Sequence, residues 1–174
     1  MSKYEEFLVR NNLKKDYMES KVLELILLNV FERLCKYLNE EDNLKTFKNK
    51  LRRIDTTFEE MLEYRRIIEK LISIKLTDEE INYIRKLIIA FLDRTDKRYI
   101  MSKGERMKIT ESQNFKCNYC GEDISGASVI DHIIAFKYTG DELHDNYQAL
   151  CSDCNKSKSD TLYYFFDIIL NKRR

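Results

Sequence analysis

The sequence of 174 residues contains no proline, no tryptophan, only four glycines and two histidines. It also lacks an excess of either charge, because 31 lysines and arginines are matched by 30 aspartates and glutamates. This balance argues against a strongly basic protein that coats nucleic acid. It leaves open a nucleic-acid enzyme, because a neutral molecule can still carry a local basic face.

Long hydrophobic runs are absent as well. The longest apolar stretch, Val22–Phe31, contains Glu24 and is followed by Glu32 and Arg33. A membrane-spanning helix needs about 20 apolar residues, so this stretch is too short and too interrupted to cross a bilayer. We also see no secretory signal, no internal repeat and no low-complexity linker. We therefore expect a soluble, cytoplasmic protein with no membrane partner.

Residues 1–97 have the pattern of a helical bundle. Apolar residues recur at spacings of three and four, as on one face of a helix. The first stripe comprises Leu23, Ile26, Leu27, Val30, Phe31, Leu34 and Leu38. A second stripe, on a helix predicted from Thr57 to about Lys75, comprises Met61, Tyr64, Ile68 and Leu71. A third helix begins with a capping-box pair, Thr77 and Glu80, and places Ile81, Ile84, Ile88 and Phe91 on its inner face. We predict three or four packed helices, and their role is open between interaction, oligomerisation and DNA contact.

One segment of this part, KTFKNKLRR, is basic. It contains five cations and no acid: Lys45, Lys48, Lys50, Arg52 and Arg53. Such a charge run is usually a solvated helix face, and a phosphate-binding patch is the alternative.

Residues 98–174 differ in character. The first of them predict a helical connector, and two short strands are expected in ASVIDHI and YQALC. A helix is expected after Cys151 with Ser152 as its cap, and the tail TLYYFFDIILNKRR has the pattern of a last amphipathic helix. The predicted fold class is therefore α+β and mainly α, with a helical domain over residues 1–97 and a small β-containing domain over residues 98–174.

Four of the five cysteines form two Cys-x-x-Cys pairs, Cys117/Cys120 and Cys151/Cys154, separated by residues 121–150. Two such pairs can place four thiolates around one ion, in the closed tetrahedral geometry of structural zinc. Unrelated cysteines and a redox pair are the alternatives, but neither accounts for two matched pairs around a β-rich insert. We predict one structural Zn²⁺ per chain, with no open position for catalysis. Cys35 stands alone on a helical face, where a buried thiol acts as a small hydrophobe.

Between and behind the cysteine pairs, the chain reads DHI, DNYQAL, CSDCN and KSK, in that order. This order resembles the HNH endonucleases of the ββα-metal fold. Their pattern is Asp-His-Ile, an Asn before a short strand, Cys-x-x-Cys followed at once by His or Asn, and then Lys. The resemblance covers roughly residues 115–160, and it implies a zinc-stapled ββα-metal nuclease module.

The resemblance implies a role for each polar residue. His132 resembles the general base that takes a proton from the attacking water, a task that suits an imidazole. Asp131 and Asn155 resemble the two ligands that hold one Mg²⁺ or Mn²⁺ against the scissile phosphate, because such hard ions prefer oxygen ligands. Asn146 resembles the residue that pins the loop and helps to orient the histidine.

Lys156 and Lys158 are expected beside this site, where they would bind substrate phosphate. The chain departs from the family at Ala135, where many members have proline, and at Asn155, where others have histidine. This HNN variant keeps every proposed catalytic group. A lone histidine in an apolar strand is more often a core residue, but the neighbouring motif residues and the four cysteines favour catalysis. His144 is not part of such a motif, and we assign it no role.

Three functions are compatible with these features. The favoured one is a metal-dependent HNH endonuclease that nicks or cleaves DNA, with a role in restriction or phage defence. The second is a nuclease subunit that is active only in a larger complex, with a homodimer or a partner protein formed through the N-terminal helices. The third is a non-catalytic zinc-knuckle module that binds nucleic acid. The intact Asp-His-Asn set and the balanced charge from Arg98 onward count against the third function. The choice between DNA and RNA stays open.

Overall fold

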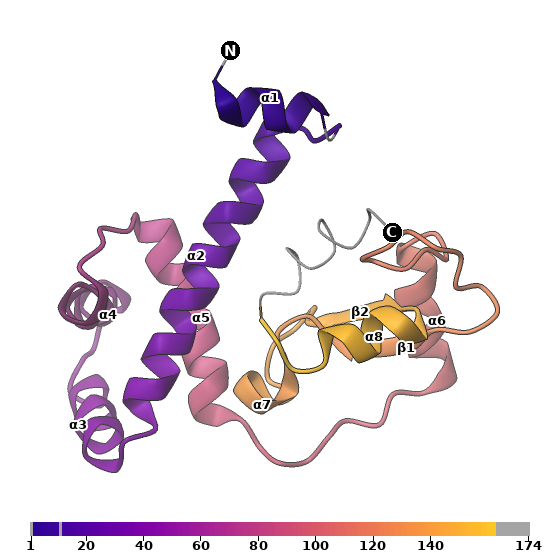
Figure 1. Ribbon diagram of the computed structural model, residues 1–174. Coiled ribbons are helices and arrows are strands. Elements are labelled where there is room, and N and C mark those ends of the chain that lie inside the picture. Colours follow the sequence, from indigo (N-terminus) through magenta and orange to yellow (C-terminus); the bar gives the residue numbers. More distant parts are fainter. Residues whose placement is uncertain (1, 11, 163–174) are drawn as a thin grey trace.

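The computed structural model describes residues 2–10 and 12–162 of the chain. Five helices come first: α1 (Lys3–Arg10), α2 (Lys15–Leu38), α3 (Glu41–Leu51), α4 (Thr57–Ile72) and α5 (Asp78–Asp93). They are followed by α6 (Lys103–Ser112), β1 (Val129–His132), α7 (Phe136–Thr139), β2 (Tyr147–Leu150) and α8 (Ser152–Lys158). The fold is therefore α+β and mainly helical, which confirms the predicted class (Figure 1).

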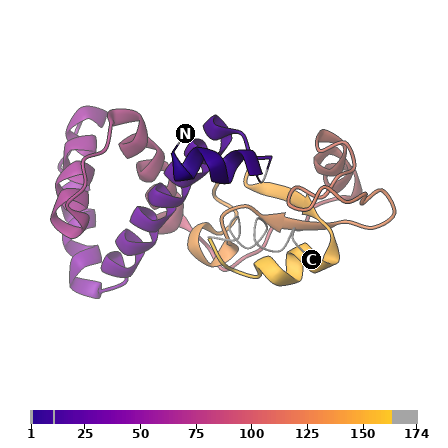
Figure 2. The same ribbon diagram turned by 45° about the horizontal axis from the view of Figure 1, so that its top comes forward.

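The first part of the chain forms the predicted helical bundle. The long helix α2 packs against α3, α4 and α5, and the second view shows the same grouping (Figure 2). Ile81, Ile84 and Ile88 of α5 lie in this core, and none of them exposes more than 1% of its surface. Thr77 caps the first turn of α5 and forms a capping box with Glu80, so the predicted start of this helix is confirmed.

The buried face of α2 differs from the predicted stripe near the start of the helix. Leu23 and Ile26 are 42% and 44% exposed, whereas Leu28, which we had not included, is buried. The N-terminal half of α2 extends beyond the bundle (Figure 1), so its apolar side chains meet fewer neighbouring helices. Helix α4 also ends three residues earlier than predicted, because Ser73 adopts the left-handed conformation that terminates a helix.

Cys35 is buried in the bundle core, as predicted, and burial raises the pKa of its thiol to about 12. The predicted basic segment runs along α3 and past its end. Within it, the Lys50 ammonium forms an ion pair with the buried Glu63 carboxylate of α4 at 2.6 Å, and thereby joins two helices. The other four cations of the segment are exposed. Their binding of phosphate stays a prediction.

The second part of the chain is arranged around a two-stranded antiparallel sheet. The two predicted strands are confirmed in shorter form, and their register pairs Asp131 with Gln148 and His132 with Tyr147. Helix α6 packs against β2, and α8 packs against β1. This sheet and α8 position the candidate site.

The two parts of the chain share a core. Helix α7 packs against α5, and Ile134 and Leu162 are buried among the side chains of the helical bundle. The division of the chain into two domains at residue 97 stays a prediction. The predicted last helix lies mostly outside the described residues, which end at Leu162. No helix of the described segments is long and apolar enough to cross a membrane.

Candidate active site and zinc centre

The four paired cysteines converge on one point. Their sulfur atoms all lie within 4.8 Å of one another, although the two pairs are far apart in the sequence. The first pair occupies a tight turn in which the Gly121 N–H donates to the Cys117 carbonyl at 3.0 Å. Gly121 has a φ of 75°, a conformation that favours glycine. The second pair begins α8, and the N-cap is Cys151 instead of the predicted Ser152, because the Cys151 sulfur accepts the Cys154 N–H at 3.4 Å.

The chemistry of this sulfur cluster fits zinc. Four converging sulfur atoms are the closed ligand set of a structural zinc site, and zinc binds the thiolate form. Burial raises the pKa of the Cys117 thiol, but surrounding backbone N–H groups outweigh burial and lower it to about 7. Burial raises the pKa of Cys120 to about 11. The residues present could therefore hold one Zn²⁺ that joins the first turn to α8 and takes no part in catalysis.

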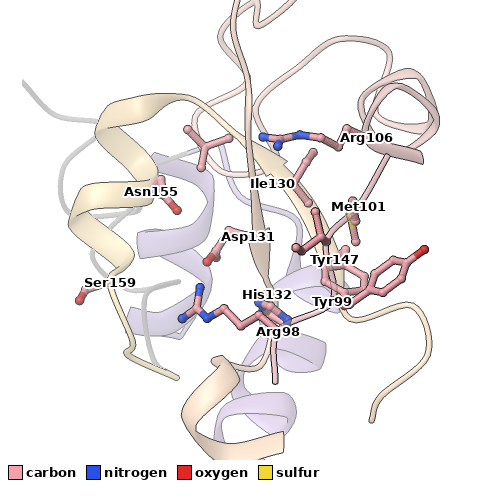
Figure 3. A pocket seen from close by; sticks show the side chains of 12 residues that line it. Arg98, Tyr99, Met101, Arg106, Ile130, Asp131, His132, Tyr147, Asn155 and Ser159 are labelled. Atoms are coloured by element: carbon pink, nitrogen blue, oxygen red, sulfur yellow. The ribbon is translucent and has the colours of Figure 1, made fainter. Parts of the chain in front are cut away.

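Three polar residues that the sequence marked out line one cavity of about 550 Å³ (Figure 3). Asp131 and His132 are the last two residues of β1, and Asn155 lies on α8. Helix α8 starts at the second cysteine pair, so the sulfur cluster sets where Asn155 lies relative to the sheet. The structure thus brings the three residues together, and their catalytic roles stay predictions.

The carboxylate of Asp131 is held through one of its oxygens. Oδ2 forms an ion pair with Lys158 Nζ at 2.8 Å and accepts a hydrogen bond from Gln148 Nε2 at 3.3 Å. Lys158 is 1% exposed, and it also donates to the main-chain carbonyl of His132 at 2.7 Å. Lys158 therefore lies beside the site, as expected, and fixes the end of β1. Its binding of substrate phosphate stays a prediction. Lys156 is exposed on α8 and does not line the cavity.

Asn146 is buried and holds the backbone that follows β1. Its Oδ1 accepts the Ile134 N–H at 2.7 Å, and its Nδ2 donates to the Ile134 carbonyl at 2.9 Å. Its own main-chain carbonyl accepts the Ile133 N–H at 2.8 Å. These bonds set the direction in which the chain leaves β1 directly after His132. Such an arrangement agrees with the loop-pinning role that the resemblance implies.

Sequence reasoning did not single out Asp141, which holds the imidazole of His132. Asp141 Oδ1 lies 2.7 Å from His132 Nε2 and accepts the Tyr147 hydroxyl at 2.5 Å. Its Oδ2 accepts the Tyr99 N–H at 2.6 Å. Burial raises the pKa of Asp141, but the hydrogen bonds from Tyr147, Tyr99 and His132 outweigh burial and lower it below its ordinary value. The carboxylate is therefore ionised, and it accepts all three bonds.

This contact selects one tautomer of His132. An ionised carboxylate can only accept hydrogen bonds, so Nε2 must carry the proton when the imidazole is neutral. Nδ1 then keeps its lone pair, and the described residues offer it no hydrogen-bond partner. The rings of Tyr147 and Phe136 pack against the imidazole with centroids 4.8 Å and 5.5 Å away. The position of the His132 ring is thus fixed, and Nδ1 is the ring nitrogen that can accept a proton when the imidazole is neutral.

The comparison with protein families agrees with this geometry. Residues 117–161 match the family model of the HNH endonucleases. The matched range includes the four clustered cysteines, the three cavity residues and Asn146, and also Asp141. No curated protein and no solved structure matches the chain significantly. Residues 117–161 therefore form a domain of the HNH endonuclease family.

Proposed function

We propose that this protein is a metal-dependent endonuclease that hydrolyses phosphodiester bonds in DNA. The observation that carries the proposal is the meeting of Asp131, His132 and Asn155 in one cavity beside the sulfur cluster. The family match supports a nuclease, and the cavity supplies a base and two oxygen ligands, which a purely binding module does not need.

His132 is the general base in this proposal. Nδ1 takes a proton from a water molecule as the water oxygen attacks the phosphorus atom, and the bond to the 3′ oxygen breaks. Asp141 keeps Nε2 protonated before this transfer and stabilises the imidazolium after it. The products are a 5′-phosphate and a 3′-hydroxyl, as the family resemblance implies.

Asp131 and Asn155 are the residues that would hold Mg²⁺ or Mn²⁺. Lys158 and Gln148 both engage Oδ2 of Asp131, which leaves its Oδ1 for an ion, and the Asn155 amide offers a second oxygen. An ion held by these two residues would stabilise negative charge on the leaving oxygen. One such site serves one strand, so the first expected product is nicked DNA. A role in restriction or phage defence is part of the proposal and rests on the resemblance alone.

The test is cleavage of supercoiled plasmid DNA with and without Mg²⁺. The metal should be removed by dialysis, because a chelator would also attack the zinc centre. We expect conversion to nicked circles in Mg²⁺ and a rate at least about 100-fold lower without it, since the ion contributes several kcal/mol to the transition state. A mock purification from cells that lack the gene controls for contaminating nucleases. Equal cleavage without a divalent ion would contradict the proposal, and activity that appears only with a partner protein would favour the larger complex.

Replacing Asp141 by alanine should lower kcat about 10- to 100-fold and leave KM nearly unchanged. The physical reason is that Asp141 holds His132 but does not line the cavity, and losing such a supporting partner typically costs this much. Cleavage rates at saturating DNA provide the measurement. The matched control is Glu142→Ala, which removes an exposed acid from the next position.

A spectroscopic readout separates positioning from general damage to the fold. The chain has two histidines, so the His144→Gln variant leaves His132 as the single imidazole signal in nitrogen NMR. We expect the Nε2–H tautomer in this background and a mixture of tautomers once Asp141 is also replaced. A single unchanged tautomer, or an unchanged kcat, would contradict the role of Asp141.

A further inference from the structure

The segment between α5 and α6 forms one wall of the active-site cavity. Arg98, Tyr99, Ile100 and Met101 of this segment line the cavity, together with Arg106 of α6. All of these residues precede the matched range 117–161, so the family model assigns them nothing. The resemblance likewise assigned no role to the connector. This wall is therefore formed by residues outside the segment that matches the HNH family model.

Both arginines of this wall lack an acidic partner. Arg65 and Arg85 of the helical bundle pair with Asp78 and Glu60, each at 2.6 Å, whereas Arg98 and Arg106 form no ion pair with any of the described residues. Asp131, the one acid among the described residues that line the cavity, already forms an ion pair with Lys158. Two exposed guanidinium groups therefore face the cavity with their charges uncompensated. Uncompensated arginines are the usual ligands of phosphate, which they bind with two parallel hydrogen bonds.

The two arginines lie at opposite ends of the site. Figure 3 shows Arg98 beside His132 and Arg106 beyond Ile130, with Asp131 between them. A nucleic-acid strand carries one phosphate per nucleotide. A strand whose scissile phosphate lies at Asp131 therefore extends its neighbouring phosphates toward both ends of the cavity.

Arg98 is held in place before any substrate binds. Its guanidinium carbon lies 4.6 Å from the centre of the Phe136 ring, in a cation–π contact. The next residue, Tyr99, donates its backbone N–H to Asp141, the same carboxylate that holds His132. One acid thus ties the arginine segment and the general base together, so the position of Arg98 relative to His132 is fixed.

We propose that Arg98 and Arg106 form a phosphate clamp that binds the backbone of the substrate strand on the two sides of the scissile phosphate. This inference rests on the proposed function, because it takes the position of the scissile phosphate from Asp131 and Asn155. The ligand is a phosphodiester strand, since two separated single cations suit successive phosphates better than one compact phosphate group. The clamp gives the HNH domain a substrate contact that comes from outside its 117–161 segment.

The test measures DNA binding without cleavage. The His132→Ala chain is titrated with a fluorescently labelled DNA duplex over a series of salt concentrations, and Arg98→Gln or Arg106→Gln is added to it. We expect each arginine substitution to weaken binding about tenfold at low salt. Each should also reduce the slope of log affinity against log salt by about 0.9, the value for one phosphate contact.

The matched controls remove an equal charge one to three positions away. Lys97→Gln and Lys103→Gln delete exposed cations that do not line the cavity, and we expect less than twofold loss and no change of slope. Arginine variants that bind like these controls would overturn the clamp. Cleavage by the wild-type chain is measured in parallel. A chain that cleaves DNA but shows no arginine effect refutes the clamp alone. A chain that does not cleave, alone or with a partner protein, refutes the proposed function. An arginine-dependent salt slope would then show phosphate binding at Arg98 and Arg106 but would overturn their placement around a scissile phosphate.

Discussion

Replacing His132 by alanine is expected to lower the rate of plasmid nicking about 100- to 10,000-fold in Mg²⁺, the usual contribution of general-base catalysis. The variant loses the imidazole, whose Nδ1 lone pair has no hydrogen-bond partner among the described residues and faces the cavity as the proposed proton acceptor. The cysteine cluster does not involve His132, so we expect zinc to stay bound. Single-turnover cleavage with a metal assay on the same sample gives both quantities.

Two further variants make this result interpretable. His144→Ala removes the other histidine of the chain, which is exposed, and it should leave the rate unchanged. His132→Gln keeps most of the volume that packs between Tyr147 and Phe136, so it controls for a local collapse of the site. If His132→Gln cleaves DNA at the wild-type rate, His132 is not the base.

The sequence predicts the parts of this molecule that depend on local patterns. The capping box of Thr77 and Glu80 marks the start of α5, because the two residues satisfy each other within one helical turn. The two Cys-x-x-Cys pairs predict the sulfur cluster, because each pair is brought together within one local turn. Only the contact between the two pairs depends on residues that are distant in the sequence. Fold class and motif therefore follow from short-range spacing.

The parts that escaped prediction depend on contacts between distant segments. Asp141 is one of three acids in the loop after β1, with Glu142 and Asp145, and spacing alone does not distinguish them. The register that places Tyr147 opposite His132 decides that Asp141 is the acid that meets the imidazole. The wall formed by the α5–α6 connector likewise depends on the path of a segment that is neither helix nor strand. Such a segment has no periodic pattern in its sequence from which its path could be predicted.

The burial of Lys158 could not be predicted from the sequence either. A lysine behind the last cysteine pair is equally compatible with a phosphate contact and with a buried structural role. The sequence does not show how closely α8 packs against β1. In the structure this packing buries the Lys158 ammonium between Asp131 and the His132 carbonyl. A buried charge of this kind needs a partner, and Asp131 provides it. The pair thereby links the proposed metal ligand to the helix that carries Asn155.

Loss of zinc is expected to unfold the region around β1, β2 and α8 while the helical bundle persists. Among the described residues, the separate core of this region has five buried side chains, with partly buried neighbours such as Ile109, Tyr119 and Ile130 packed against them. The five are Cys117, Ile124, Ala149, Leu150 and Cys154. Two of these five belong to the sulfur cluster that could hold Zn²⁺, so few apolar side chains remain buried without the ion. Structural zinc contributes about 10–16 kcal/mol in zinc-finger peptides near neutral pH, far more than so small a core can replace. The change to make is Cys154→Ser, and hydrogen exchange of the backbone amides is the measurement.

In Cys154→Ser, amides of β1 and β2 should lose protection, whereas those of α2 and α5 keep it because the bundle has its own larger core. The fifth cysteine supplies the matched control. Cys35→Ala removes a buried thiol from the bundle, so it should loosen α2 modestly and leave one zinc per chain. Because Asn155 and Lys158 follow Cys154 on α8, cleavage should disappear together with the zinc in Cys154→Ser alone. A zinc-free chain that keeps both strands protected and still nicks DNA would show that the sulfur cluster does not hold this site together.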